Sequence, residues 1–336
     1  MKIITAIICT FLVNVHCVAF EKNAATIQTE LVTQSLLLDI KNINNEFLVA
    51  VGERGHIIRS FDGIDWQQMS VPTKATLTSV FFLNGKLGWA VGHDSTILHS
   101  QDGGISWSLQ QSLPQLERPL LSVLFSDALH GMAVGAYGSF FETSNGGITW
   151  QQAFHLSLLS EEDTSYLMEL KKEDTQAYLE ERSSLLPHFN RVFENKGTFY
   201  LAGELGLLAS SFDNGKTWQR FAEIYQGSFF DIAQVSQQRL LAVGLRGNIF
   251  LKSSEISPWQ KIEVDTKALL NSIVLATDKM LFILGNSGVL LTSNNSGKSF
   301  EMKQLSDGKA LLSGTMFNDS LIIASEVGIK RVKVID

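Results

Sequence analysis

Cysteine is nearly absent from this chain of 336 residues. Its two copies, Cys9 and Cys17, both lie near the N-terminus, inside a segment that resembles an export signal. Once that segment is removed, the protein has no disulfide, no cysteine metal ligand and no cysteine nucleophile. Its stability must therefore come from packing.

Long hydrophobic runs are also missing, apart from one at the N-terminus. Lys2 precedes an apolar run, residues 3–15, and a small-x-small pattern suited to a signal peptidase follows at residues 17–19. The run is shorter than the ~20 apolar residues that span a bilayer, so a membrane anchor is the less favoured alternative. A lipid-attachment site fits less well still, because His16 precedes the cysteine. The sequence predicts a cleaved signal peptide, residues 1–19, and a periplasmic or otherwise exported protein.

Positive charge is scarce as well. The formal net charge is −7, and removal of the signal takes Lys2 with it and makes the charge one unit more negative. Nucleic acid and anionic lipid both bind clustered lysine and arginine, so neither is expected as the main partner. The hydrophobic content of 45% and the 21 Phe indicate a well-packed fold rather than a disordered chain.

The sequence is rich in repetition. Six similar segments, such as "SFDGIDW", "SQDGGISW" and "TSNGGITW", end in an aromatic residue, and these residues are 41, 43, 68, 41 and 41 positions apart. A second motif runs in register as "VGERG", "VGHDS", "VGAYG", "AGELG", "VGLRG", "LGNSG" and "ASEVG". Two motifs in register at this spacing indicate a repeated supersecondary unit.

Each unit holds four short β-branched or aromatic segments separated by Gly, Asn and Asp, such as "LTSVFF", "GWAVG", "STILHS" and "SWSLQQ". Four strands in roughly 40–45 residues are typical of a β-propeller blade. Seven copies predict an all-β, seven-bladed β-propeller over residues 20–336. The repeat ends before a fourth strand of the last blade, so we expect an N-terminal strand, Thr26–Val32, to complete that blade and close the ring.

The turn before each aromatic residue resembles the Asp-box, S/T-x-D-x-G-x-T/S-W, of BNR-repeat propellers such as the sialidases and the sortilin ectodomain. Its third position holds Asp or Asn in most copies, and Glu255 stands there in blade 5. A structural turn tolerates these exchanges, whereas an EF-hand-type loop needs several oxygen ligands at alternate positions. We therefore expect no metal and no cofactor. The residues expected to build the blades are Asp62, Trp66, Asp102, Trp107, Asn145, Trp150, Asp213 and Trp218.

An enzyme is the alternative function class, because sialidases share the Asp-box. Sialidase chemistry requires three arginines that bind the substrate carboxylate, a nucleophilic tyrosine with a glutamate partner, and an acid. No arginine lies in the Arg-Ile-Pro context that marks the first of the three, and the histidines show no metal-ligand spacing. We therefore predict a protein that is not an enzyme, with a degenerate sialidase-like glycan-processing or glycan-binding propeller as the alternative.

The two motifs together, VGxxG-x-I-x-x-S/T-x-D-G-G-x-T/S-W, resemble the photosystem II stability/assembly factor family of exported seven-bladed propellers. The resemblance covers nearly all of the mature chain except residues 155–187. It implies a monomeric, non-catalytic binding or assembly module for a membrane-associated protein client. Family members carry an arginine patch made partly from VGxRG loops, and only Arg54 and Arg246 retain that arginine here.

The interval of 68 contains an insertion, residues 155–187, with apolar residues at helical spacing, a capping Ser160 and a stop at Pro187. We expect one or two helices, which either pad the ring or form a partner-binding arm. Antiparallel strand order places the Asp-boxes on one face, and the VGxxG turns with the insertion on the other. The residues expected to bind a partner on that second face are Glu53, Arg54, His93, Asp94, Tyr137, Glu204 and Arg246.

Overall fold

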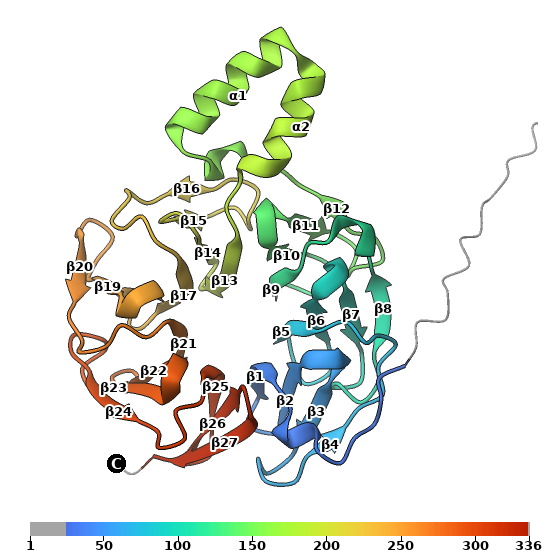
Figure 1. Ribbon diagram of the computed structural model, residues 1–336, viewed down its shortest axis with the longest axis vertical. Coiled ribbons are helices and arrows are strands. Elements are labelled where there is room, and N and C mark those ends of the chain that lie inside the picture. The colour runs from blue at the N-terminus through green and yellow to red at the C-terminus, as the bar shows by residue number, and fades with distance from the viewer. Residues whose placement is uncertain (1–24, 335–336) are drawn as a thin grey trace, which may run out of the picture.

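The computed structural model describes residues 25–334, which form a ring of seven antiparallel sheets around a central axis (Figure 1). Six sheets have four strands in sequential order and the last sheet has three. This arrangement confirms the seven-bladed β-propeller. The predicted signal peptide and both cysteines lie outside the described residues. No helix in the described range is long and apolar enough to cross a membrane.

The blades follow one another along the chain, each built from the axis outward. The strands of blades 1 to 3 are β1 (Leu37–Ile43), β2 (Phe47–Gly52), β3 (Ile57–Ser60), β4 (Gln67–Gln68), β5 (Leu77–Phe82), β6 (Gly88–Gly92), β7 (Ile97–Ser100), β8 (Ser108–Gln111), β9 (Leu120–Phe125), β10 (Gly131–Gly135), β11 (Phe140–Thr143) and β12 (Gln151–Gln152). Those of blades 4 to 7 are β13 (Phe189–Asn195), β14 (Thr198–Gly203), β15 (Leu208–Ser211), β16 (Gln219–Arg220), β17 (Phe229–Gln234), β18 (Leu240–Gly244), β19 (Ile249–Lys252), β20 (Trp259–Ile262), β21 (Leu270–Leu275), β22 (Leu281–Gly285), β23 (Val289–Ser293), β24 (Glu301–Gln304), β25 (Leu311–Phe317), β26 (Ser320–Ser325) and β27 (Gly328–Lys333).

The core is divided among the seams between neighbouring blades. Second strands such as β6 and β22 are buried along their whole length, because both faces of a blade are covered by its neighbours, whereas the outer strand β24 is exposed throughout. Trp107 shows how a box aromatic fills a seam: it is 7% exposed and packs edge-on against Phe82 of its own blade, in a cluster with Phe47 of the preceding blade. The aromatic residues therefore hold the blades together.

The last blade is not completed by an N-terminal strand, so this part of the prediction is wrong. β25, β26 and β27 form a sheet of three. Thr26 instead lies against blade 1, where its backbone N–H donates to the Val71 carbonyl at 3.0 Å and its hydroxyl lies 3.1–3.3 Å from three buried carbonyl oxygens. Val32, at the start of the short helix η1 (Val32–Gln34), is buried in the seam between blades 7 and 1. At this seam the ring closes by side-chain packing rather than by a shared sheet.

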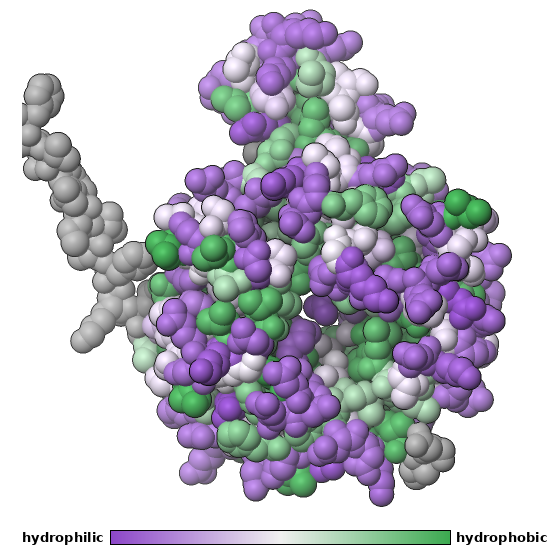
Figure 2. All heavy atoms as spheres, turned by 180° about the vertical axis from the view of Figure 1, so that it is seen from behind, coloured by the Kyte–Doolittle hydropathy of each residue, from purple (hydrophilic) through white to green (hydrophobic). Residues whose placement is uncertain are grey.

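The insertion forms two helices, α1 (Glu161–Glu173) and α2 (Thr175–Leu185), as predicted. The Ser160 hydroxyl caps α1 by accepting the Asp163 N–H at 3.0 Å. Leu167 and Tyr178 are buried against the seam between blades 3 and 4. The helices project beyond the outline of the ring, and their outer end is hydrophilic (Figures 1 and 2). We call residues 156–186 the arm.

Candidate functional site

The Asp-box of blade 2 uses its polar side chains within the turn. Asp102 Oδ1 accepts the Ser100 hydroxyl at 2.9 Å and the Ser106 N–H at 2.9 Å, while Oδ2 accepts the Ser106 hydroxyl at 2.6 Å. Gly104, at φ 84°, donates its N–H to Ser100 Oγ at 2.8 Å, and the Trp107 indole N–H donates to the Gly104 carbonyl at 3.0 Å. The residues that resemble a metal-binding loop therefore form hydrogen bonds with one another within the turn.

The asparagine copies explain why the carboxylate is replaceable. Asn145 Oδ1 accepts the Thr149 N–H at 3.0 Å, as the aspartate does in other blades, and Asn145 Nδ2 donates to the Thr149 hydroxyl at 2.9 Å. Only the direction of the hydroxyl bond is reversed. The structural role expected of the boxes is thus supported by their hydrogen bonds.

Hydrogen bonds also lower the pKa values of the box aspartates. The Thr217 hydroxyl and N–H are the main cause that lowers the pKa of Asp213 to about 2. Partial burial tends to raise the pKa of Asp102, but hydrogen bonds from Ser106 and Ser100 lower it below its usual value. Both carboxylates are therefore ionised at neutral pH and serve as acceptors.

Blade 5 departs from the expectation, because Glu255 does not replace the box aspartate. Glu255 is exposed and makes no hydrogen bond or ion pair within residues 25–334. Lys252 Nζ donates instead to the Ser257 carbonyl, and the Ser254 and Ser257 hydroxyls lie 2.6 Å apart. Blade 1 has an equally short loop but keeps Gly63 at φ 72° and a working box. The blade 5 loop lacks that glycine, so its backbone cannot turn in the same way.

The VGxxG turns differ from the Asp-box turns, because their variable side chains point to solvent instead of forming hydrogen bonds within the loop. In each of blades 1 to 6, the residue at the fourth position has a positive φ of 52–58° and an exposed side chain. This left-handed conformation costs a non-glycine residue about 1–2 kcal/mol. The turn is held by its backbone, as where the His56 N–H donates to the Glu53 carbonyl at 2.9 Å. These six residues are Arg54, Asp94, Tyr137, Leu205, Arg246 and Ser287.

The predicted partner-binding residues lie around the ring rather than in one cluster. Arg54 is 79% exposed, and its neighbour Glu53 accepts the Leu36 N–H at 3.1 Å and so supports the turn. His93 and Asp94 are exposed on blade 2. Arg246 is exposed on blade 5, which is not adjacent to blade 1 (Figure 1). The structure therefore does not bring the two retained arginines together.

Tyr137 and Glu204 do come together, with two residues that the sequence analysis missed. The Arg118 guanidinium lies 5.7 Å from the centre of the Tyr137 ring, and its Nη1 donates to the Tyr137 carbonyl at 3.3 Å. The His188 ring packs edge-on against the Tyr137 ring at 4.5 Å between centroids, and His188 Nδ1 lies 3.5 Å from Glu204 Oε2. We call these four residues the blade 3–4 corner. The base of the arm adjoins it, because a Cβ on Gly138 would collide with Leu186.

A second missed set lines the central channel. The third residue of every inner strand is polar or charged, at a point where the strand register shifts. A cavity of about 120 Å³ lies at this level. The members of this ring are Asp39, Ser79, Ser122, Arg191, Asp231, Ser272 and Ser313.

The channel carboxylates join neighbouring blades. Asp39 accepts the Lys41 ammonium at 2.7 Å, the Ser313 hydroxyl at 2.6 Å from blade 7 and the Val80 N–H at 3.0 Å from blade 2. Asp231 in turn accepts the Ile273 N–H at 2.8 Å from blade 6 and lies 3.3 Å from Arg191 Nε. Burial tends to raise the pKa of Asp39, but Lys41 and Arg191 lower it overall. Both carboxylates are therefore already bound by hydrogen-bond donors and cations of the fold.

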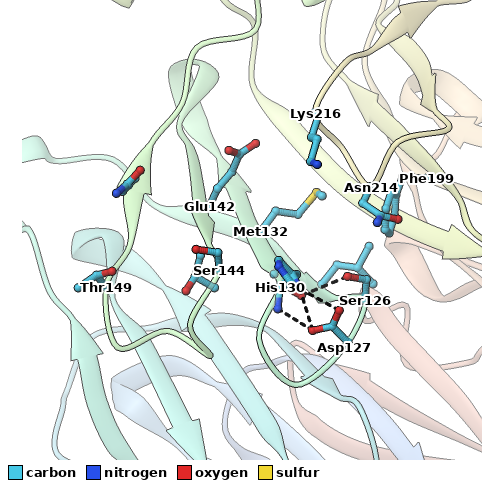
Figure 3. A pocket seen from close by; sticks show the side chains of 14 residues that line it. Ser126, Asp127, His130, Met132, Glu142, Ser144, Thr149, Phe199, Asn214 and Lys216 are labelled. Carbon is cyan, nitrogen blue, oxygen red and sulfur yellow. Dashed lines mark hydrogen bonds and ion pairs between the residues drawn. The ribbon is translucent and has the colours of Figure 1, made fainter.

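A cavity of about 540 Å³ between blades 3 and 4 contains the pair closest to a catalytic arrangement (Figure 3). His130 Nδ1 lies 2.9 Å from Asp127 Oδ2, but the Ser126 hydroxyl donates to the His130 main-chain carbonyl at 3.4 Å. A Ser-His-Asp mechanism needs the serine bonded to the imidazole. Within residues 25–334, no group of three or more His, Cys, Asp or Glu could hold a metal ion.

Comparison with known protein sequences finds the resemblance in the N-terminal part of the chain. A family model described as "Photosynthesis system II assembly factor YCF48" matches residues 19–116, which include blades 1 and 2. The photosystem II assembly protein Ycf48 of Synechococcus sp. (strain JA-3-3Ab) is 42% identical over 50 residues. That stretch is 14% of this chain and spans only 15% of the relative's length.

Solved structures share the fold over nearly the whole chain. One described as "YCF48 bound to D1 peptide" has a TM-score of 0.68 and 19% identity, covering 93% of this chain and 97% of that one. The GH74 enzyme of Niastella koreensis has a TM-score of 0.64 and 11% identity, covering 89% of this chain and 52% of that one. A binding protein and an enzyme thus share this fold, so the fold alone does not decide function.

Proposed function

This chain has the repeat, the fold and, over its first two blades, the sequence pattern of the photosystem II assembly factor-like family, and from that premise we propose that it is a non-catalytic binding module for a membrane-associated protein client. The client binds the VGxxG face as an extended segment or loop. We also propose that the protein is monomeric and that it is exported. The exported location rests on the signal peptide predicted over residues 1–19.

One observation carries this proposal: the six exposed positive-φ residues of the VGxxG turns each join the second strand of a blade to the third, so antiparallel order puts all six on one face. Non-glycine residues in left-handed conformation cluster at binding and switch sites, where function outweighs their cost. Their side chains differ from blade to blade, as the contacts of a binding surface do. The Asp-box face, in contrast, repeats one set of internal hydrogen bonds in every box but that of blade 5, and the non-glycine residues at positive φ in its loops are mostly asparagines, which tolerate this conformation.

The distribution of these residues favours a large partner. Arg54 and Arg246 lie on blades that are not adjacent, and the blade 3–4 corner lies between them along the chain. A small molecule would touch only one of these places. Arginine and tyrosine dominate interface energies, so Arg54, Tyr137 and Arg246 are the proposed anchors, with the arm beside them.

Catalysis is not part of the proposal. The channel acids Asp39 and Asp231 are each bound by donors from neighbouring blades, and the Ser126 hydroxyl is not bonded to the His130 ring. A general acid or nucleophile needs a reactive group aimed at the substrate. Neither place offers one.

The test measures binding of the D1 peptide, because a YCF48 structure contains that ligand. Fluorescence anisotropy with labelled peptide compares the parent, the Arg54→Ala/Arg246→Ala double variant and a variant whose residues 161–185 are replaced by a short Gly-Ser loop. We expect the double variant to lose at least about tenfold in affinity, since hot-spot truncations cost more than 1 kcal/mol each.

Lys216→Ala is the matched control, because Lys216 is an exposed cation on the Asp-box face. Its affinity should equal that of the parent. Equal affinity of all four proteins would overturn the assignment of the face, and loss only in the control would place the client on the opposite face. Absence of binding by the parent would overturn this client class.

A further inference from the structure

The outer edge of the last blade is open. In every other blade a fourth strand covers the third, whereas β27 has no strand beyond it among residues 25–334. β27 is six residues long, while the outermost strands of the other blades have two to four. Natural sheets usually keep exposed edges short, because an unpaired edge is a template for another chain.

The hairpin register identifies the backbone groups that face outward. Ser325 pairs with Gly328 across a two-residue turn, and at the other end the Val334 N–H donates to the Asp319 carbonyl at 3.0 Å. Antiparallel pairs alternate between bonded and non-bonded positions, so Lys330 and Val332 direct their backbone groups toward β26. The N–H and C=O groups of Ile329, Arg331 and Lys333 therefore point away from the sheet.

The N-terminal segment covers only the beginning of this edge. Gly328, at φ 94°, lies against the Thr33 carbonyl, so closely that a Cβ there would clash. The residues that precede Thr33 run toward blade 1, where the Thr26 hydroxyl donates a hydrogen bond to the Val71 carbonyl. The remaining length of β27 is left without a backbone partner in the described range.

The charge of the edge selects its partner. β27 carries Lys330, Arg331 and Lys333 and no acidic residue, in a chain of net charge −7. Lys330 is already paired with Asp307, and Arg331 Nε donates one hydrogen bond to Ser320 Oγ at 3.0 Å. Arg331 and Lys333 are nevertheless exposed at the edge. A second copy of β27 would place like charges opposite one another, which destabilises a strand pair. An acidic strand would place opposite charges there.

We propose that the last blade binds an extended acidic segment of a protein partner as its fourth strand, by hydrogen bonding to the outer edge of β27. Strand addition of this kind takes its affinity from main-chain bonds and its specificity from alternate side chains. Ile329, Arg331 and Lys333 share the face toward blade 1, whereas half-buried Val332 lies on the face toward blade 6. Acidic residues of the partner would face Arg331 and Lys333, and an apolar residue would face Val332. The partner strand therefore alternates acidic and apolar residues. This site lies on the rim and is independent of the client-binding face.

The probe is a labelled heptapeptide with tryptophan followed by alternating glutamate and valine, and binding to the full chain is followed by fluorescence anisotropy. Peptides with glutamine for glutamate, and with a central proline, are the comparisons. We expect the acidic peptide to bind at least tenfold more tightly than either.

Two variants at one position separate the backbone from the charge. Arg331→Pro removes an outward N–H, and proline is tolerated at a sheet edge. Arg331→Gln removes the charge but keeps the N–H. We expect the proline variant to lose at least tenfold in affinity and the glutamine variant to lose less. Lys303→Gln, an exposed cation on the outer strand of blade 6, should bind as the parent does.

Amide hydrogen exchange locates the peptide. The amides of Ile329, Arg331 and Lys333 should exchange rapidly in the free protein and slow at least tenfold when the acidic peptide binds. Thermal melting checks that the variants are folded. Protection of these amides before peptide is added would mean that the chain itself or a second copy fills the edge, and would overturn the proposal. So would equal binding of all three peptides, or protection at another blade.

Discussion

Each blade contains two kinds of turn, and they use their side chains in opposite ways. In the Asp-box turn of blade 2, Asp102 accepts hydrogen bonds from groups of its own loop, and Trp107 is buried in a seam. The VGxxG turn of blade 3 is held by its backbone and leaves the Tyr137 side chain half exposed. Tyr137 has a positive φ, which is unfavourable for a tyrosine residue. The first turn is built for stability, and the second accepts a cost that stability does not explain.

This comparison shows where sequence variation carries information. Where the box is kept, its acid changes only to a residue that keeps the bonds, as Asn145 does with one bond reversed, whereas the box of blade 5 is lost. The exposed VGxxG position can hold Arg, Asp, Tyr, Leu or Ser because its side chain points to solvent and is not buried in the core. Residues that differ at an equivalent, strained position are therefore the better candidates for function.

The largest difference should come from the box aromatic. Trp107→Ala empties part of the seam between blades 1 and 2 and should lower the free energy of unfolding by about 3–5 kcal/mol, the range for a buried large aromatic. Urea denaturation followed by circular dichroism measures this loss. A variant that unfolds at the same urea concentration as the parent would show that the box aromatic does not stabilise the fold.

The next effect should come from the box carboxylate. Asp102→Ala leaves the Ser100 and Ser106 groups without their acceptor and should cost about 1–3 kcal/mol. Asp102→Asn keeps the acceptor and can reverse the hydroxyl bond as Asn145 does, so it should cost less than about 1 kcal/mol. Thermal unfolding at pH 7 compares the two variants. Equal losses would show that the aspartate charge itself is required.

A smaller effect should appear as a pH dependence. The pKa of Asp213 is about 2 in the folded protein, below the ~3.9 of an unfolded chain. Its ionised form therefore stabilises the fold above about pH 4, and this contribution is lost as the pH falls from about 4 toward 2. Asp213→Asn should have a shallower loss of stability over that range, measured by denaturation at several pH values. Parallel curves for the two proteins would contradict the assignment.

The smallest effect on stability should come from the VGxxG turn. Tyr137→Gly relieves the left-handed strain and should leave the free energy of unfolding unchanged or raise it by up to about 1 kcal/mol. The same variant should bind the client more weakly, because it removes the centre of the blade 3–4 corner. Calorimetric melting and peptide binding are compared on one sample. A large destabilisation would mean that Tyr137 belongs to the fold, as Trp107 does.

The candidate site could be predicted only in part. Tyr137, Glu204 and the arginines follow from the VGxxG register, because their positions repeat along the sequence. Arg118 and His188 lie in blade-to-blade connections 70 residues apart, and only the ring brings them to the same side chain. The polar ring of the channel had a readable signal, since Asp39 and Asp231 occupy equivalent places in apolar strands.

The sequence by itself determined the blade count, the turns and the helical insertion of this protein. These features depend on short-range chemistry, such as a hydroxyl, a carboxylate and a glycine within one loop, repeated at a fixed interval. The broken box of blade 5 shows the limit, because Glu255 keeps an acid but the loop has lost its glycine. A turn can therefore be predicted from its sequence motif only where all the residues that form its hydrogen bonds and its bend are present.

Only the tertiary structure decided how the ring ends. Residues 26–32 have the pattern of a strand, and two distant surfaces compete for them: the edge of β27 and the carbonyl groups of blade 1. The buried Thr26 hydroxyl and N–H find acceptors on blade 1, and Val32 fills the seam between blades 7 and 1. Competition of this kind depends on which groups the folded blades bring within bonding distance, and no local pattern contains that information.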